Sequence, residues 1–288
     1  MADAAPGTAA PTSLLAQARP LFLLGLPRSG TTFCAKLLDS HPQILMTNEV
    51  RAFTFFQHAF REIPTGDAGG THCSRVHGDE FVEGLRAYVG PVLRRTYERI
   101  AEKRGATDLR FWGDKNPHHT NTLPLMAECF PGARFVRMRR DPRDVVCSIR
   151  ELHVGMGLVK SGEPPLAVLG RISRTVSVSI HMARRFFGGR PGLAYREVGY
   201  EEMLAAPDAG IQDLFGDFLG LEDHAAPRAW IAEDGRRDSH GHFLEKTDFV
   251  QRSVARWRRD LEPEQLRAVE EGLGDALTLE GYEPAATP

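Results

Sequence analysis

The sequence predicts an α/β fold in which a central, mainly parallel sheet is flanked by helices. Three observations lead to this expectation. Short apolar runs alternate with longer amphipathic segments, which is typical of parallel strands joined by helical crossovers. A glycine-framed turn joins the first apolar run to the first amphipathic segment. The 288 residues are 42% hydrophobic and 26% charged, as in a globular protein with one sizeable core.

The predicted strands follow the apolar runs. They lie at residues 21–27, 43–49, 109–115, 133–140 and 192–200. Segments between them predict helices at residues 31–39, 79–104, 143–152 and 166–187. Pro142 suits the first turn of the helix that follows the fourth strand. The aromatic stretch 52–60 has helical spacing, which indicates a core helix or a wall of a ligand pocket.

Segments rich in Gly, Pro and His separate these elements. Residues 61–78 and 153–165 are expected to be loops and parts of a lid. The Ala/Pro/Thr-rich residues 1–18 predict a mobile tail. Residues 19–288 are expected to form a single domain.

Charge and cysteine usage exclude several classes of function. The net charge of −2 gives no reason to expect nucleic acid or an anionic membrane as a partner, so any basic site must be local. Arginines do gather locally, at Arg134, Arg137, Arg139, Arg140, Arg143 and Arg150. Cysteines 34, 73, 129 and 147 show no C-x-x-C spacing, which favours reduced thiols in a cytoplasmic protein. No run reaches the roughly 18 apolar residues of a membrane span, and no secretion signal is expected.

Residues 25–32, GLPRSGTT, directly follow the first predicted strand. They match the phosphate-loop pattern G-x-x-x-x-G-K-[ST] except that Thr31 stands where the lysine would be. A helix that begins after such a loop presents free backbone N–H groups to an anion. Without the lysine that grips terminal phosphates, the loop suits a compact oxyanion of lower charge, such as a bridged phosphate-sulfate. Turn geometry alone could also explain Gly25 and Gly30, so the loop by itself leaves the ligand open.

Polar residues also stand at the ends of the other predicted strands. These are Asn48 and Glu49 after the second strand, Asp114 and Lys115 after the third, and Arg139, Arg140 and Asp141 after the fourth. Because the carboxyl ends of parallel strands meet at one edge of a sheet, these groups are expected to converge on one bound anion. A base, a lysine and several arginines are what group transfer from an anionic donor to a hydroxyl requires.

Two separated motifs, PRSGTT at residues 27–32 and RDPRD at residues 140–144, resemble those of the PAPS-dependent sulfotransferases. The order of NEV, GDKNP, RDPRDVVCS and GYEEML is most similar to the tyrosylprotein sulfotransferases and their soluble bacterial relatives, over roughly residues 20–260. The resemblance implies a three-layer fold of the P-loop type. It also implies transfer of a sulfuryl group from PAPS to a hydroxyl, release of adenosine 3′,5′-bisphosphate, and no metal requirement.

The resemblance also implies roles for single residues. It assigns the 5′-phosphosulfate to Arg28, Ser29, Gly30, Thr31 and Thr32. Glu49 matches the catalytic base, and Lys115 matches the lysine that stabilises charge at the bridging oxygen and the sulfuryl group. Arg28 and Ser239 are expected to assist the transfer.

Further positions match the remainder of the nucleotide site. Arg140 and Ser148, eight residues apart, correspond to the 3′-phosphate ligands. Tyr200 is expected to contact the cofactor and Lys246 a phosphate, although the spacing around Ser239 and Lys246 departs slightly from the family pattern. A basic residue is expected four residues after Ser148, but Leu152 stands there, which leaves Arg150 as a substitute.

Other interpretations stay open at this stage. The chain could be a P-loop kinase of a small metabolite, against which the absent loop lysine counts, or a nucleotide-binding protein without catalysis. Glu49 and Lys115 could be surface charges paired with neighbours. Histidines 118, 119, 240 and 242 lack a completing ligand, so they are expected to face solvent or substrate rather than a metal. The acceptor is expected to be a small phenol, sugar, lipid alcohol or peptide tyrosine. Loops 61–78, 153–165 and 222–248 are expected to contact it and to determine which of these is used. The oligomeric state is open.

Overall fold

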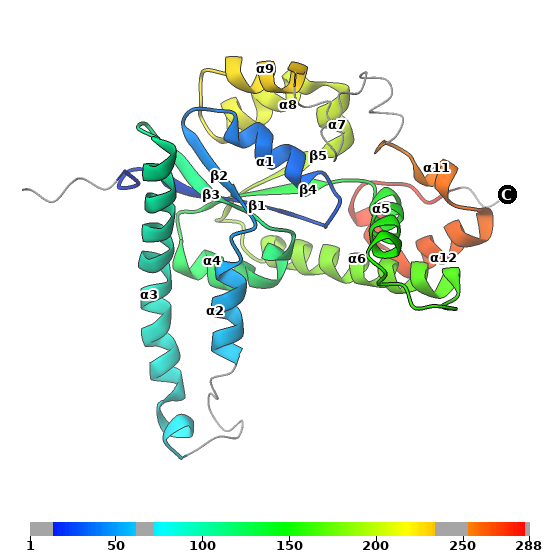
Figure 1. Ribbon diagram of the computed structural model, residues 1–288, viewed down its shortest axis with the longest axis horizontal. Helices are drawn as coiled ribbons and strands as arrows, with labels where there is room; N and C mark the ends of the chain where they lie inside the picture. The colour runs from blue at the N-terminus through cyan, green and yellow to red at the C-terminus, as the bar shows by residue number, and fades with distance from the viewer. Residues whose placement is uncertain (1–13, 62–71, 234–252, 286–288) are drawn as a thin grey trace, which may run out of the picture.

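The computed structural model describes residues 14–61, 72–233 and 253–285 (Figure 1). Within these residues, a five-stranded parallel sheet has the strand order β2-β3-β1-β4-β5. The strands are β1 (Arg19–Gly25), β2 (Ile44–Asn48), β3 (Phe111–Lys115), β4 (Arg134–Arg139) and β5 (Ala194–Gly199). Each predicted strand overlaps one of them, and helices flank the sheet, so the predicted fold class is confirmed.

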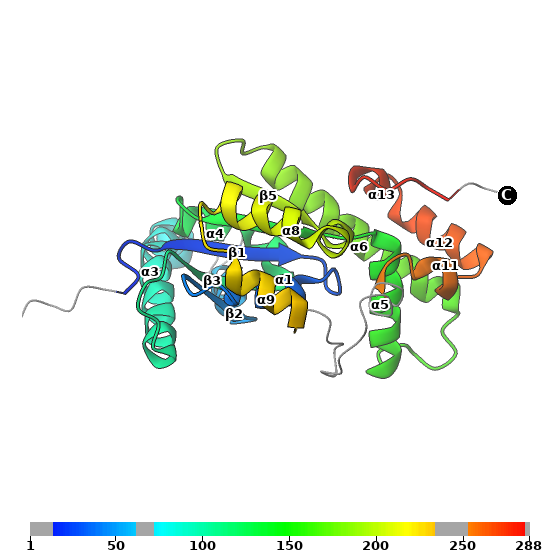
Figure 2. The ribbon, with the colours of Figure 1, turned by 90° about the horizontal axis from the view of Figure 1, so that it is seen from above.

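The sheet buries both faces, as a parallel sheet with helical crossovers must. In β1, Leu21 and Leu23 pack on one face, and Phe22 and Leu24 pack on the other. The alternation follows from the two-residue period of a strand. Figure 1 shows helices above and below the sheet, and Figure 2 shows the same layers from above.

The helices form three groups. One group covers the face of Leu21 and Leu23: α1 (Thr31–Asp39), α7 (Tyr200–Ala205), α8 (Pro207–Ile211), the π-helix η2 (Gln212–Phe218) and α9 (Ala225–Glu233). The second group lies on the opposite side: α2 (Ala52–Arg61), α3 (His72–Arg104), the 3₁₀ helix η1 (Pro117–Thr122), α4 (Leu123–Cys129) and α6 (Pro165–Gly188). The third group packs against α6: α5 (Pro142–Gly155), α11 (Trp257–Asp260), α12 (Pro263–Leu273) and α13 (Ala276–Leu279).

Several predicted boundaries are wrong. Helix α3 begins at His72, so residues 72–78 are helical rather than part of a loop. Their Ser, His and Gly content suggested a break, but weak local propensity yields to the continuation of a long helix. The loop expected at 153–165 is shorter, because α5 continues to Gly155. Helix α9 occupies part of the segment 222–248 that was expected to be a loop.

The start of the chain also differs from expectation. Leu15 and Ala18 were assigned to a mobile tail, yet both are buried in the cluster that holds Phe22 and Leu24. Arg94 of α3 donates a hydrogen bond to the Leu15 carbonyl at 2.7 Å. Leu15 and Ala18 therefore belong to the core, whereas Leu14, Ala16 and Gln17 are exposed. None of the helices in the described ranges combines the length and the apolar character needed to cross a bilayer.

Candidate active site

The loop between β1 and α1 folds as a compact turn. Gly25 and Gly30 have φ values of 155° and 93°, and Arg28 also adopts a left-handed backbone, with a φ of 69°. The Ser29 hydroxyl donates to the Leu26 carbonyl at 2.7 Å and thereby closes the turn. Helix α1 begins without a side-chain cap at Gly30, so its first N–H groups point toward the space in front of the loop. This arrangement suits an anion.

The four predicted loop side chains do not share one environment. Ser29 and Thr31 are buried, whereas Arg28 and Thr32 are exposed. A methyl group added at Gly30 would lie 2.4 Å from Cδ2 of Tyr200, so only glycine allows the Tyr200 ring to pack against the loop. Tyr200, at the start of α7, is therefore brought to the phosphate loop from a distant part of the chain.

Glu49 and Lys115 meet at the ends of two neighbouring strands. The parallel register pairs Asn48 with Lys115, and the Glu49 amide donates to the Lys115 carbonyl at 2.8 Å. The Lys115 ammonium then lies 2.9 Å from Glu49 Oε1. Lys115 is buried, while the Glu49 side chain is 41% exposed. The hydrogen bond from Lys115 is the main cause that lowers the pKa of Glu49 below its ordinary value.

Asp114, which the sequence predicted as one of the groups around the bound anion, is a buried carboxylate that fixes the turn at Glu49. Asp114 Oδ1 accepts a hydrogen bond from the Val50 amide at 3.2 Å and one from the Thr47 hydroxyl at 2.9 Å. Its other oxygen, Oδ2, lies 3.4 Å from Nε2 of the buried His119. Glu49 itself has a left-handed backbone, with a φ of 60°. Asp114 therefore secures the amide that directly follows a strained residue.

Arg140, Arg28 and Ser148 form a second cluster. The Arg140 guanidinium stacks over the Tyr200 ring at 4.7 Å and donates to the Arg28 carbonyl at 2.7 Å and to the Ser253 carbonyl. Arg28 Nε in turn donates to the Ser148 hydroxyl at 3.0 Å. The residues predicted for the two ends of the nucleotide are thus joined in one network. Arg140 Nε is buried, and no group of the described residues accepts its proton.

The other arginines of residues 134–150 serve the fold. Arg137 is buried between Glu197 and Glu280, at 2.8 and 2.7 Å. Arg143 pairs with Asp141 and Glu270 at 2.9 and 2.8 Å. The remaining ones bind other groups: Arg134 lies over the rings of Phe111 and Phe218, Arg139 pairs with Glu202, and Arg150 donates to the Asp260 carbonyl. Of this arginine cluster, Arg140 is the one that reaches the phosphate loop.

The histidines that the sequence singled out lie in different environments. His118 is exposed, as expected, but His119 is buried against Asp114 and does not face solvent. Ser239, Lys246, His240 and His242 lie outside the described residues. Among the residues that the structure describes, no group of three or more His, Cys, Asp and Glu side chains is arranged to hold a metal ion.

The chain is similar to several known proteins. The model of the "Sulfotransferase family" matches residues 20–225. The nodulation protein NoeE of Sinorhizobium fredii is 28% identical over 285 residues, which cover 91% of this chain and 65% of that protein. Protein-tyrosine sulfotransferase 1 of Mus musculus is 28% identical over 138 residues, 45% of this chain and 33% of that protein. The chain therefore spans less than two thirds of the length of these curated relatives.

A solved structure shares the fold. The mouse sulfotransferase SULT7A1 complexed with PAP has a TM-score of 0.53 and 15% identity, and the superposition covers 92% of this chain and 88% of that chain. At this identity the likeness supports the fold alone. The family match covers most of the chain, including the phosphate loop, Glu49, Lys115 and Arg140, and confirms the resemblance found in the sequence. The chain belongs to the sulfotransferase family.

Proposed function

We propose that this chain transfers a sulfuryl group from PAPS to the hydroxyl of an acceptor, with Glu49 as the base. The observation that carries the proposal is the contact between the buried Lys115 ammonium and Glu49, at the same sheet edge as the PRSGTT loop. Such a contact holds a proton acceptor and a cation within reach of one reacting centre. We further propose that residues 19–288, together with the buried Leu15 and Ala18 that precede them, act as one transferase domain.

The residues present fit the donor. Arg140 keeps a buried Nε–H without a partner among the described residues, which a phosphate oxygen would satisfy. Arg28 and Ser148 lie beside it and supply further donors. The open start of α1 suits a second anionic group. The solved relative named as a complex with PAP supports the choice of an adenosine bisphosphate. When bound, PAPS supplies the sulfuryl group.

The proposed reaction is an in-line displacement. The acceptor oxygen bonds to sulfur while the bond from sulfur to the bridging oxygen breaks, and adenosine 3′,5′-bisphosphate leaves. Glu49 takes the proton of the acceptor hydroxyl. Once protonated, Glu49 no longer attracts the Lys115 ammonium as a carboxylate does, so that cation becomes available to the charge on the leaving oxygen. No protein group needs to form a covalent intermediate.

Two other functions predict different behaviour. A kinase would bind ATP with magnesium through its phosphate loop, yet Thr31 stands where the kinase loop has lysine. A binding protein without catalysis would not depend on Glu49. Glu49→Ala is therefore expected to abolish turnover while the affinity for adenosine 3′,5′-bisphosphate is unchanged, and equal turnover in the variant would remove Glu49 as the base.

The donor is tested by calorimetric titration with adenosine 3′,5′-bisphosphate, AMP, and ATP with magnesium. Binding of the bisphosphate without metal is expected, and a preference for ATP with magnesium would favour a kinase. Arg140→Ala should weaken bisphosphate binding about 10-fold or more, the size of a charge-assisted hydrogen bond, with little effect on AMP. Arg134→Ala is the matched control, because Arg134 begins the strand that Arg140 directly follows and lies over Phe111 and Phe218. An equal loss for both nucleotides would refute the 3′-phosphate assignment.

A further inference from the structure

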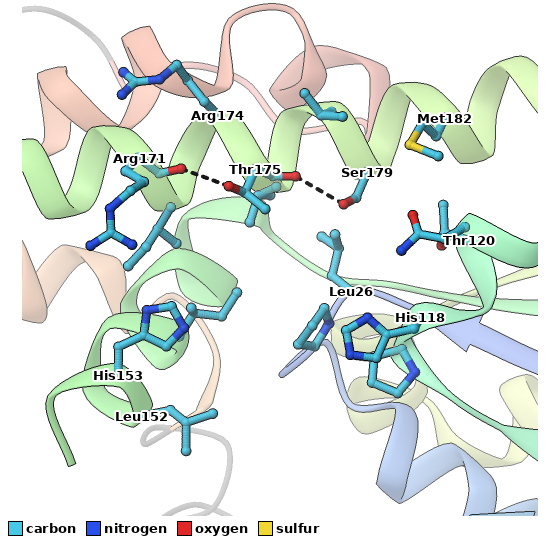
Figure 3. A pocket seen from close by; sticks show the side chains of 17 residues that line it. Leu26, His118, Thr120, Leu152, His153, Arg171, Arg174, Thr175, Ser179 and Met182 are labelled. Atoms are coloured by element: carbon cyan, nitrogen blue, oxygen red, sulfur yellow. Dashed lines mark hydrogen bonds between the residues drawn. The ribbon is translucent and has the colours of Figure 1, made fainter. Parts of the chain in front are cut away.

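A cavity of about 700 Å³ lies beside the candidate active site (Figure 3). It is bounded by the end of β1 and the phosphate loop, by η1, by α5 and by one face of α6. Its volume falls in the range of pockets that bind small molecules, roughly 300–1,000 Å³. Leu26, Ile149, Ile172, Val176 and Met182 supply apolar walls.

The cavity adjoins the residues proposed for catalysis, but Glu49 and Lys115 are not among the residues that line it. Pro27 of the phosphate loop lines it, as do Pro117 and His118, which closely follow Lys115 in the sequence. His118 is close enough for its charge to contribute to the lowered pKa of Glu49. A molecule in this cavity therefore has one end beside the phosphate loop and beside the turn that follows Lys115.

The polar residues of the α6 wall offer few free donors. The Thr175 hydroxyl donates to the Arg171 carbonyl and the Ser179 hydroxyl to the Thr175 carbonyl, both at 3.0 Å and one helical turn away. The dashed lines in Figure 3 show both bonds. Arg171 is paired with Glu163 at 3.0 Å, and Figure 3 shows Arg174 pointing away from the cavity. The wall is thus less polar than its residue types suggest, and its arginines are poorly placed to bind an anion.

His153 is an exception on this largely apolar surface. Its Nδ1 is buried, and no group of the described residues makes a hydrogen bond to it. Figure 3 shows His153 and His118 on opposite sides of the cavity. A buried polar atom without a partner is unfavourable, so a rotation of the His153 ring that brings Nδ1 to a neutral polar group of the ligand gains a hydrogen bond there.

Apolar side chains continue beyond the cavity. Leu152, Val178 and Met182 line it and are each more than 40% exposed. These three side chains are therefore apolar surface that is shared by the cavity wall and the solvent. Exposed apolar surface of this kind marks a binding site more often than chance. The surface suits a ligand whose apolar part is longer than the cavity.

We propose that this cavity binds the acceptor, and that the acceptor is an uncharged alcohol or phenol with an extended apolar body. The proposal rests on the proposed sulfuryl transfer and names its substrate class. A peptide tyrosine fits less well, because a peptide backbone brings donors and acceptors at every residue that this wall does not satisfy. An anionic acceptor would find Arg171 already paired with Glu163 and the Arg174 side chain directed away from the cavity.

The test uses the full chain, PAPS and a series of 4-alkylphenols from methyl to octyl, with a tyrosine-containing peptide for comparison. kcat/KM is expected to rise by up to about fourfold for each methylene until the cavity is filled, as apolar transfer predicts. Ser179→Phe, which fills the cavity from α6, should lower kcat/KM for 4-octylphenol at least 10-fold and leave 4-methylphenol nearly unchanged. Arg185→Phe, on the same helix but exposed and outside the cavity, is the control.

His153 is tested separately. A terminal hydroxyl on the octyl chain should lower KM in the wild-type chain and have no such effect in His153→Phe, which keeps a ring of similar shape. An equal benefit of the hydroxyl in both chains would overturn the assignment of His153.

Binding of adenosine 3′,5′-bisphosphate separates the two proposals. If the wild-type chain does not bind it, the sulfuryl-transfer proposal fails. If the bisphosphate binds, three results show that the cavity proposal alone is wrong. They are a kcat/KM that does not change across the alkylphenol series, an unchanged kcat/KM in Ser179→Phe, and a higher kcat/KM for the peptide. Bisphosphate affinity also reports whether Ser179→Phe is folded. If Ser179→Phe is not folded, Thr175→Phe, one helical turn away on the same wall of the cavity, repeats the test.

Discussion

Asp114 offers a test of how the chain places Glu49, the proposed base. Its Oδ1 accepts the Val50 amide at 3.2 Å, directly after Glu49, whose φ is 60°. A left-handed backbone at a residue other than glycine costs about 1–2 kcal/mol. A hydrogen bond to a charged group contributes about 1.5–3 kcal/mol. The two quantities are similar, so this bond is what keeps the turn in its strained form.

The expected effects follow from that balance. Asp114→Ala removes the acceptor, and the share of molecules with Glu49 in place should fall about 10-fold to 100-fold, since each 1.36 kcal/mol is a factor of ten. kcat should fall by the same factor. Asp114→Asn keeps an oxygen for the Val50 amide and loses only the charge, so a loss of about fivefold is expected.

Steady-state kinetics and calorimetry on the same variants provide the assay. The affinity for adenosine 3′,5′-bisphosphate should stay within twofold of the wild type. Asp39→Ala is the matched control, because Asp39 accepts the Met46 amide of the same strand at 2.8 Å, away from Glu49. That variant should lose stability but not kcat. If Asp114→Ala keeps kcat within twofold, or loses bisphosphate affinity in proportion to kcat, the reasoning is refuted.

Three further predictions follow from the structure. Lys115→Ala should move the acid limb of the pH–rate profile to higher pH, because the proposed base Glu49 must be ionised and Lys115 holds the pKa of Glu49 below 4.5. Lys115→Arg should keep the acid limb near the wild-type position. An unmoved acid limb in Lys115→Ala would contradict the pairing of Lys115 with Glu49. Burial raises the pKa of Asp144 from 3.8 to about 6, so the folded state loses stability as pH rises between these values. Asp144→Asn should therefore be more stable than the wild type in urea at pH 8, by up to about 3 kcal/mol, and by little at pH 4. Gly113→Ala should lower the free energy of unfolding by about 3 kcal/mol or more, because the added carbon would lie 1.7 Å from the Leu21 carbonyl oxygen. At Gly132 an added carbon would have no atom within 4 Å, so Gly132→Ala should unfold at the wild-type urea concentration.

The convergence at the sheet edge was predictable because it depends on chain direction alone. Once the apolar runs were read as parallel strands, Arg28, Glu49, Lys115 and Arg140 had to stand at neighbouring strand ends. The phosphate loop was predictable for a similar reason, since its glycines and the following helix are contiguous in sequence. These features need no knowledge of which side chains pair.

Pairing over long sequence distances was not predictable. The arginine-rich segment 134–150 suggested an anion site, but Arg137 and Arg143 meet Glu280 and Glu270 from α12 and beyond. No local sequence pattern predicts which distant carboxylate will pair with a given arginine. For the same reason the sequence did not predict that Asp114 holds the Val50 amide, and it predicted that His119 faces solvent or substrate although His119 is buried. The cavity also went unnoticed, because its wall is a face of α6 rather than one of the expected loops.

Arg28 and Glu49 share one feature with a practical consequence. Both are residues other than glycine with left-handed backbones, at φ values of 69° and 60°. Glycine at either position would relieve about 1–2 kcal/mol of strain and return about 0.5–1 kcal/mol through the greater freedom of the unfolded chain. A library selected only for thermal resistance should therefore enrich glycine at positions 28 and 49, and lose sulfuryl transfer as it does so. Positions at which glycine raises thermal stability and lowers activity would then identify active-site residues before the substrate is known.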